Sequence, residues 1–244
     1  MKGVVLAGGL GMRLQPMTKV VNKHLLDVFD EPMIFYPLRT LARAGITDVT
    51  VVTGKEIDQF RSLLGDGSSL NLRLSYAQQT GELGIADALA QAEAETHGSP
   101  LVVILGDNIF QDDLSKYVSA YSRQGGGAKL LLKRVAPEDA KRFGVATVED
   151  ERIVQITEKP ERPQSDLAVT GCYMYDETVF DVIKGLKPSD RGELEITDVS
   201  NHYVKAGTAS FEILNGWWTD AGTPASKLKA SILVSLSKGV TFNA

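Results

Sequence analysis

Near the start of the chain a buried-strand pattern runs directly into a glycine-rich turn, and this stretch constrains the fold most. The apolar run 4–7 is followed by Gly8, Gly9 and Gly11. A short apolar run bounded by glycine is typical of a buried strand. Because glycine carries no side chain, the N–H groups of such a turn can converge on an anion.

Basic residues follow the turn closely. Arg13 comes two positions after the last glycine, and Lys19 and Lys23 follow. A bare backbone turn with a guanidinium and ammonium groups behind it is what a polyphosphate site requires. The signal is weak by itself. The turn lacks the closing Gly-Lys-Ser/Thr of a P-loop and the G-x-G-x-x-G dinucleotide spacing, so a plain strand-to-helix turn with surface charges is the alternative.

The first half of the chain alternates between strand and helix patterns. Further strands are predicted at 46–53, 70–76 and 101–105, and helices at 33–44 and 85–96. This order predicts an α/β fold with a Rossmann-like, mostly parallel central sheet flanked by helices. Since ligands sit at the carboxyl ends of parallel strands, the Gly8 turn and Asp107 should share one edge of the sheet.

The second half has shorter, hairpin-like spacings. Strands are predicted at 129–135, 144–148, 153–156, 169–175 and 211–214, and helices at 177–186, 193–206 and 224–237. We expect one nucleotidyltransferase domain over 1–244. It would have a nucleotide-binding half at about 1–125 and a β-rich, sugar-phosphate-binding half at 126–244, with one sheet continuous through both.

Two carboxylates follow predicted strands far apart in the sequence. Asp107 comes just after the predicted strand 101–105. Asp220 comes after two tryptophans and before an Ala-Gly-Thr turn. Each alone would be read as a helix N-cap or turn aspartate. Together, beside a phosphate-binding turn, they predict a Mg²⁺ site, because that ion takes one or two carboxylates and completes its shell with phosphate oxygens and water.

Bulk composition excludes several classes of protein. Net charge is −5, so no nucleic-acid surface is indicated. The single cysteine, Cys172, excludes an internal disulfide framework, and no run approaches the ~20 apolar residues of a membrane helix. The histidines 24, 97 and 202 have no metal-ligand spacing. The initial apolar run is unlike a signal peptide, so we expect a cytoplasmic protein without membrane or nucleic-acid partners.

The motifs of the chain together resemble those of the sugar-1-phosphate nucleotidylyltransferases, and among them those that use a thymidine nucleotide and glucose 1-phosphate. The resemblance covers nearly the whole sequence. It rests on the order and spacing of LAGGLGMRL at 6–14, NKHLL at 22–26, PMIFYPL at 32–38, LGDNIF at 105–110, RFGVA at 142–146, EKP at 158–160, AVTGCYMYD at 168–176, RGELEITDV at 191–199 and WWTDAGT at 217–223.

The resemblance implies a role for each matching position. The triphosphate would be held by the backbone of Gly8, Gly9 and Gly11 and by the cations of Arg13 and Lys23, and Asp107 and Asp220 would bind magnesium. The base would be read by Gln79 and Gly84. The sugar phosphate would be held by Gly144, Glu158, Lys159 and Val169, with Lys159 clamping the incoming phosphate. Arg13, Lys23, Lys159 and Asp107 are the expected catalytic residues, and a homo-oligomer is implied.

Three positions depart from the family pattern. Met12 stands where threonine is usual, Asp27 where many members have proline, and His24 where longer members have glutamine. None replaces an expected metal ligand or Lys159. Longer members carry a C-terminal helical extension that contributes to regulation, and this chain ends soon after its last predicted helix. We therefore expect a short form without that extension, with feedback control of that kind in doubt.

The expected reaction transfers a nucleotidyl group from dTTP to glucose 1-phosphate and releases pyrophosphate. The nearest alternative is the same reaction with UTP or a modified hexose 1-phosphate. A methyl group in a binding pocket contributes only ~1–3 kcal/mol to discrimination between the two bases. A non-catalytic nucleotide-sugar sensor is another alternative, but loss of a metal carboxylate or a clamp lysine would mark it. A dinucleotide-dependent oxidoreductase is disfavoured by the glycine spacing and by the second strand, which no acidic residue closes.

Overall fold

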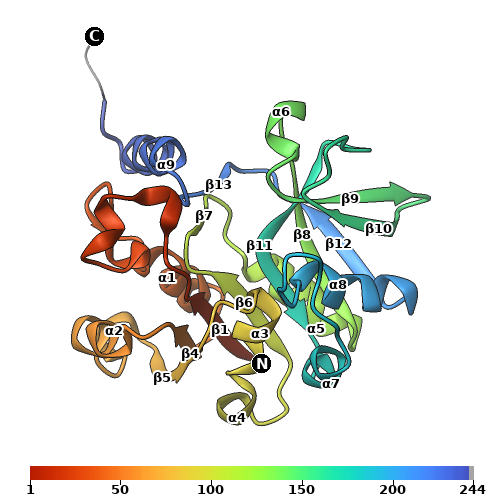
Figure 1. The fold of residues 1–244 in the computed structure, drawn as a ribbon, viewed down its shortest axis with the longest axis horizontal. Helices are drawn as coiled ribbons and strands as arrows, with labels where there is room; N and C mark the ends of the chain where they lie inside the picture. The colour runs from red at the N-terminus through yellow and green to blue at the C-terminus, as the bar shows by residue number, and fades with distance from the viewer. Residues whose placement is uncertain (242–244) are drawn as a thin grey trace.

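A nine-stranded mixed sheet forms the centre of the molecule in the computed structural model, which describes residues 1–241 (Figure 1). Four of its strands are parallel neighbours from the first part of the chain: β6 (Leu101–Leu105), β1 (Lys2–Ala7), β4 (Asp48–Thr53) and β5 (Arg73–Gln78). Their carboxyl ends lie at one edge of the sheet, as the sequence pattern predicted.

The remaining strands extend this sheet on the other side of β6. They are β8 (Ala128–Arg134), β9 (Gly144–Glu149), β10 (Arg152–Glu158), β11 (Leu167–Tyr175) and β12 (Ala209–Ile213). Strand β11 runs antiparallel to β6, with Cys172 opposite Ile104, and so joins the two halves in one sheet. The division into a nucleotide half and a sugar half stays a prediction.

Two short strand pairs lie beside the main sheet. In one, β7 (Asn108–Phe110) pairs antiparallel with β13 (Trp218–Asp220); in the other, β2 (Asp27–Val28) pairs with β3 (Glu31–Pro32). The last helix, α9 (Pro224–Ser237), contacts both β13 and β2 and so lies over the N-terminal segment (Figure 1).

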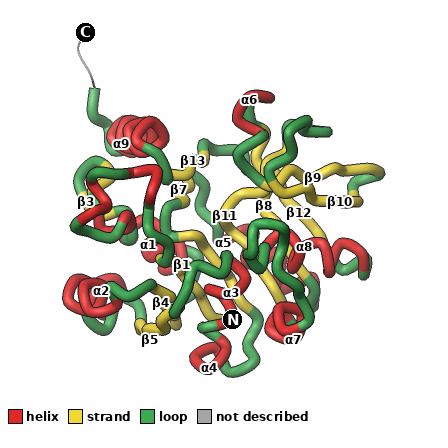
Figure 2. The backbone as a smooth tube through the Cα atoms, viewed as in Figure 1, coloured by secondary structure: helices red, strands yellow, loops and turns green. Residues whose placement is uncertain are grey.

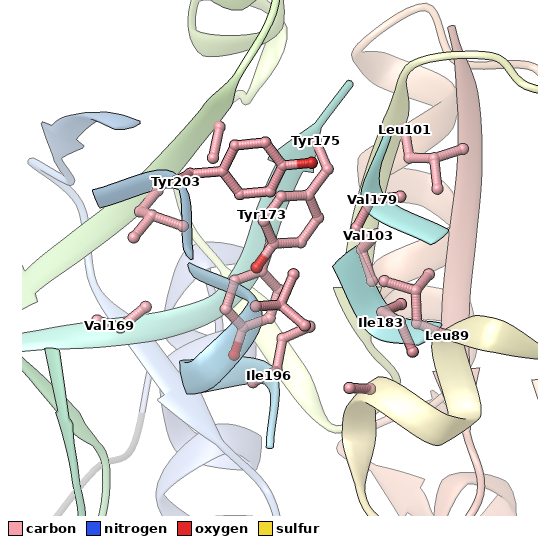
Figure 3. Close-up of a cluster of buried hydrophobic side chains, with 14 of the residues drawn as sticks. Leu89, Leu101, Val103, Val169, Tyr173, Tyr175, Val179, Ile183, Ile196 and Tyr203 are labelled. Carbon is pink, nitrogen blue, oxygen red and sulfur yellow. The ribbon is translucent and has the colours of Figure 1, made fainter. Parts of the chain in front are cut away.

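The helices divide between the two faces of the sheet because successive strand residues point in opposite directions. Val4 and Leu6 of β1 pack in one core cluster with helices α3, α7 and α8, and Val5 and Ala7 pack in another with α1, α2 and α5 (Figure 2). Figure 3 shows the first cluster, where Leu101 and Val103 of β6 meet the tyrosines of β11. The helices are α1 (Phe35–Arg43), α2 (Ile57–Leu64), α3 (Ile85–Ala90), α4 (Glu93–Thr96), α5 (Ser115–Gln124), α6 (Pro137–Ala140), α7 (Val179–Lys184) and α8 (Ile196–Lys205).

The α/β prediction is therefore confirmed, with differences in detail. No helix was predicted at α2 or α5, whose apolar residues are few but lie on one helical face. The helix predicted at 85–96 divides into α3 and α4. Four 3₁₀ turns, η1 (Met12–Leu14), η2 (Met17–Lys19), η3 (Lys23–Leu25) and η4 (Ser68–Leu70), were also not foreseen. Among the described residues, no helix combines the length and apolarity needed to cross a bilayer.

Candidate active site

A cavity of about 430 Å³ opens at the carboxyl ends of β1 and β6. This is within the usual size of a small-molecule site. It contains every site residue predicted from the sequence except Gly11, namely Gly8, Gly9, Arg13, Lys23, Gln79, Gly84, Asp107, Gly144, Glu158, Lys159, Val169 and Asp220.

The glycine turn forms one wall of this cavity. Gly8 approaches Gln79 so closely that a Cβ would lie 2.9 Å from Oε1 of that side chain, and Gly9 has a φ of 89°, in the region that favours glycine. The N–H of Leu10 donates a 2.9 Å hydrogen bond to a carboxylate oxygen of Glu82. An anionic oxygen therefore already lies at the backbone of this turn, as an anion-binding turn would allow.

Gly11 has a different environment from the other two glycines. It lies outside the cavity lining, its φ is 61°, and a Cβ would come within 2.9 Å of the Thr18 side chain. Thr18 also donates a hydrogen bond to the Gly11 carbonyl at 2.8 Å. The structure thus shows Gly11 shaping the turn, and its predicted contact with a triphosphate stays untested.

The two predicted metal carboxylates are brought together by strand pairing. Asp107 follows β6 after one residue, Gly106, and in the β7–β13 pair Asp220 lies opposite Asn108. The Ala221 N–H donates to the Asp107 carbonyl at 2.8 Å, and Asn108 donates to the Asp107 carboxylate at 2.9 Å. The Asn108 amide oxygen also accepts from the Trp218 indole and from the Gly171 N–H. This network fixes β13 against β7 and β11.

The carboxylates and Arg13 converge on one point. A Cβ built on Gly222 would lie 3.0 Å from Nη2 of Arg13, 3.3 Å from Oδ2 of Asp220 and 3.4 Å from Oδ2 of Asp107. The two carboxylate oxygens are therefore at most about 6.7 Å apart, the sum of the last two distances. Gly222 leaves open the space that these three side chains face.

Each carboxylate has a basic partner. Lys23 Nζ lies 2.6 Å from Oδ2 of Asp107, and Arg142 Nη2 lies 2.9 and 3.0 Å from the two oxygens of Asp220. Burial opposes ionisation of Asp107, but the charge of Lys23 holds the pKa of this carboxyl well below its usual range. Burial and the nearby Asp107 charge raise the pKa of Asp220, although Arg142 acts against this shift.

His24, one of the departures from the family pattern, is a neutral support beneath this centre. Burial and the Lys23 charge lower its pKa to about 3, and its Nδ1 lies 2.8 Å from the Asn22 side-chain oxygen. A Cβ on Gly106 would come within 2.7 Å of the His24 ring. The ring therefore packs directly under the residue that precedes Asp107.

Gln79 faces the glycine turn with a defined amide orientation. Its Nε2 donates to a carboxylate oxygen of Asp87 at 2.8 Å and to the Gly84 carbonyl at 3.2 Å. Because both partners are acceptors, the amide nitrogen must point at them, and Oε1 points toward Gly8. No hydrogen-bond donor from within residues 1–241 reaches this Oε1. Gly84 has a φ of 101°, and a Cβ there would collide with the Leu194 carbonyl.

Glu158 and Lys159 also line the cavity. Oε2 of Glu158 accepts from Thr197 at 2.6 Å, and Lys159 Nζ is 3.1 Å from Oε1 of Glu158. Lys159 has a φ of 41°, unusual for a residue with a side chain, and its N–H donates to the Phe143 carbonyl. A Cβ on Gly144 would lie 3.3 Å from the Thr197 hydroxyl, and Val169 adds an apolar wall.

Several lining residues escaped the sequence reasoning. Glu82 accepts a hydrogen bond from the Leu10 N–H in the glycine turn, and Asn108 donates to the Asp107 carboxylate. One nitrogen of Arg191 donates to both oxygens of Glu195. Arg142 was quoted within the motif RFGVA without a role of its own. Only the contacts of these residues distinguish them from ordinary surface charges, and those contacts connect positions that are distant in the sequence.

Comparison with known proteins identifies the family of this chain. Residues 2–235 match the family model described as nucleotidyl transferase. A glucose-1-phosphate thymidylyltransferase of Neisseria meningitidis is 42% identical over 98% of this chain and 84% of its own length. One from an Actinoplanes species is 41% identical over 94% of this chain and 77% of its own length.

Solved structures share the same fold. A Bacillus anthracis protein, provisionally described as a glucose-1-phosphate thymidylyltransferase and solved with sucrose, is 47% identical, with a TM-score of 0.92 over 100% of this chain and 98% of that chain. A UDP-glucose pyrophosphorylase solved with UDP-glucose is 25% identical, with a TM-score of 0.85 over 97% of this chain and 98% of that chain.

Proposed function

The chain belongs to the nucleotidyl transferase family, and on this premise we propose that it joins dTTP and glucose 1-phosphate to give dTDP-glucose and pyrophosphate. One observation carries the proposal. Asp107, Asp220 and Arg13 converge on the space above Gly222, in a cavity that the glycine turn and Lys159 also line.

The reaction needs no general base, because a sugar phosphate is already an anion at neutral pH. The difficulty is that one anion must approach another at the α-phosphorus, so catalysis consists of positioning and electrostatic stabilisation. Lys159 would hold the incoming phosphate. Arg13 and Lys23, beside the glycine turn, would stabilise the charge that develops on the leaving pyrophosphate.

The carboxylate pair fits a magnesium ion. Both side chains face the space above Gly222, which a methyl group would fill. The site offers two carboxylates, within the number that Mg²⁺ takes. When bound, the ion would supply positive charge to the phosphate oxygens.

The orientation of Gln79 supports a thymine or uracil base. Its Oε1 faces the glycine turn and can accept a hydrogen bond from the N3–H that both bases carry. Cytosine has an acceptor at N3, which would face Oε1 unfavourably. UTP is therefore the second candidate substrate, in keeping with the similarity to UDP-glucose pyrophosphorylase.

The experiment is a matrix of dTTP, UTP, CTP, ATP and GTP against several hexose 1-phosphates, scored by pyrophosphate release. We expect release only when both substrates are present, with the highest kcat/KM for dTTP and glucose 1-phosphate, UTP below it and CTP near background. Preference for CTP or a purine triphosphate would refute the base assignment. Absence of pyrophosphate from every pair would refute the transferase.

Glu82 should weaken triphosphate binding, because its carboxylate lies at the Leu10 N–H of the turn that would hold the anion. Glu82→Gln keeps an acceptor for this N–H and removes the charge. Two like charges about 4 Å apart in water repel by ~1 kcal/mol. The KM for dTTP should therefore fall about threefold to fivefold with kcat unchanged. A higher KM than in the wild type, measured beside the distant variant Glu149→Gln, would contradict this expectation.

Three features expected from the sequence and from the family resemblance stay predictions. A homo-oligomer is tested by sedimentation velocity of the whole chain. Magnesium as the preferred ion is tested by comparing Mg²⁺, Mn²⁺ and Ca²⁺ in the pyrophosphate assay. A cytoplasmic location is tested by fractionating the source cells.

A further inference from the structure

Arg142 forms an ion pair with Asp220, one of the two predicted metal ligands. One nitrogen, Nη2, donates to both oxygens of Asp220, at 2.9 and 3.0 Å. The pair is formed at the cavity, which both residues line, and the Asp220 side chain is only 14% exposed. The guanidinium therefore occupies the carboxylate face on which a cation would otherwise bind.

The guanidinium is held in this position by contacts on other sides. Nη1 lies 3.2 Å from Oδ1 of Asp139, and the Phe143 ring lies 5.1 Å from Cζ, in cation–π range. Phe143 itself packs against Trp218, with ring centroids 4.9 Å apart. Since Trp218 stands two residues before Asp220 on β13, one small cluster fixes both partners of the ion pair.

Charge explains why such a pair is needed. Asp107 and Asp220 have oxygens no more than about 6.7 Å apart in a largely buried site, so their negative charges repel. Lys23 compensates the charge of Asp107, and Arg142 compensates that of Asp220. A divalent cation between the carboxylates would compensate both charges at once.

We propose that Arg142 is a positioning residue that takes the place of the divalent cation on Asp220 and yields this carboxylate when the cation binds. The inference rests on the metal site of the proposed function. Because Nη2 engages both oxygens, a cation that binds either one must weaken the bond to Arg142. The guanidinium and the cation are competitors, so removing the guanidinium strengthens cation binding, whereas damage to the site would weaken it.

The test measures Mn²⁺ binding to the whole chain without substrates, by electron paramagnetic resonance of free Mn²⁺. Arg142→Gln should lower the Kd for Mn²⁺ about tenfold, the value expected when a charge-assisted hydrogen bond no longer opposes binding. The Mn²⁺-dependent rise in Tm should be larger than in the wild type. Arg142→Lys, which keeps the charge but not the fork of donors, should have an intermediate Kd and serves if Arg142→Gln does not fold.

Arg134→Gln is the matched control, because Arg134 also donates from one nitrogen to both oxygens of an aspartate, Asp166, but does so on the surface. It should leave the Kd for Mn²⁺ unchanged. Adding Asp220→Asn to Arg142→Gln should abolish the gain. An equal or higher Kd in Arg142→Gln, or no Mn²⁺ binding by the wild type, would overturn the inference. Failure of the proposed function is a separate result, since it is scored by pyrophosphate and not by Mn²⁺ binding.

Discussion

Asp107→Asn should lower the kcat for pyrophosphate release by about a thousandfold, the largest effect that we expect from a single substitution. Asparagine has the shape of aspartate and can still accept the hydrogen bond from Asn108, but it lacks the charge that pairs with Lys23 and faces the space above Gly222. Losing one preorganised electrostatic group typically costs 10²–10³ in turnover. Steady-state kinetics with saturating dTTP and glucose 1-phosphate measure the change.

Asp166→Asn serves as the control for this substitution. Asp166 pairs with Arg134 on the surface. The Asp166→Asn variant should retain the kcat of the wild type, because an exposed ion pair contributes little to stability. Circular dichroism of Asp107→Asn should match the wild-type spectrum. A folded Asp107→Asn variant with kcat within tenfold of the wild type would remove Asp107 from the catalytic centre.

Gly222→Ala should lower kcat about a hundredfold, although it removes no functional group. The added methyl would lie 3.0 Å from the Arg13 guanidinium and 3.3–3.4 Å from the carboxylates of Asp220 and Asp107. These side chains would have to shift by a few tenths of an ångström, and the methyl would occupy the space that they face. Misplacement of reacting groups by about 1 Å costs on the order of 10²-fold.

The control for the added methyl is Gly185→Ala. Gly185 ends α7 with a φ of −85°, and a Cβ there would approach no atom closer than 3.5 Å. Gly222 likewise has no positive φ, so neither substitution strains the backbone. The Kd for Mn²⁺ should rise in Gly222→Ala and stay unchanged in Gly185→Ala. Wild-type kcat and Kd in Gly222→Ala would mean that the space above Gly222 is not where the substrates and the cation meet.

The inner strands β1 and β6 of the central sheet were predictable because they are nearly continuous apolar runs. The runs at 4–7 and 101–105 are buried on both faces, so no polar residue interrupts them, and glycine or a Gly-Asp pair ends each. Helices α2 and α5 escaped prediction because each buries only two or three side chains in one stripe. Such a short amphipathic signal is easily hidden among charged residues.

The candidate site was predicted unevenly. Side chains that stand next to a strand end, such as Asp107, could be placed from the order of elements. The roles of Glu158 and Lys159 came only from the family resemblance, since a charge pair before a proline is usually a solvated turn. Arg142 and Glu82 were missed because their significance lies in partners 78 and 72 positions away in the chain.

The sequence by itself determined which turn would expose its backbone N–H groups and which strands would be buried. Glycine placement and apolar periodicity act over only a few residues. Tertiary structure alone decided that Asp220 lies opposite Asn108 on β13, next to Asp107. That register depends on hydrogen bonds and packing between β7, β11 and β13, which join residues up to 110 positions apart. Local patterns carry no information about such pairings, since only the folded core makes them favourable.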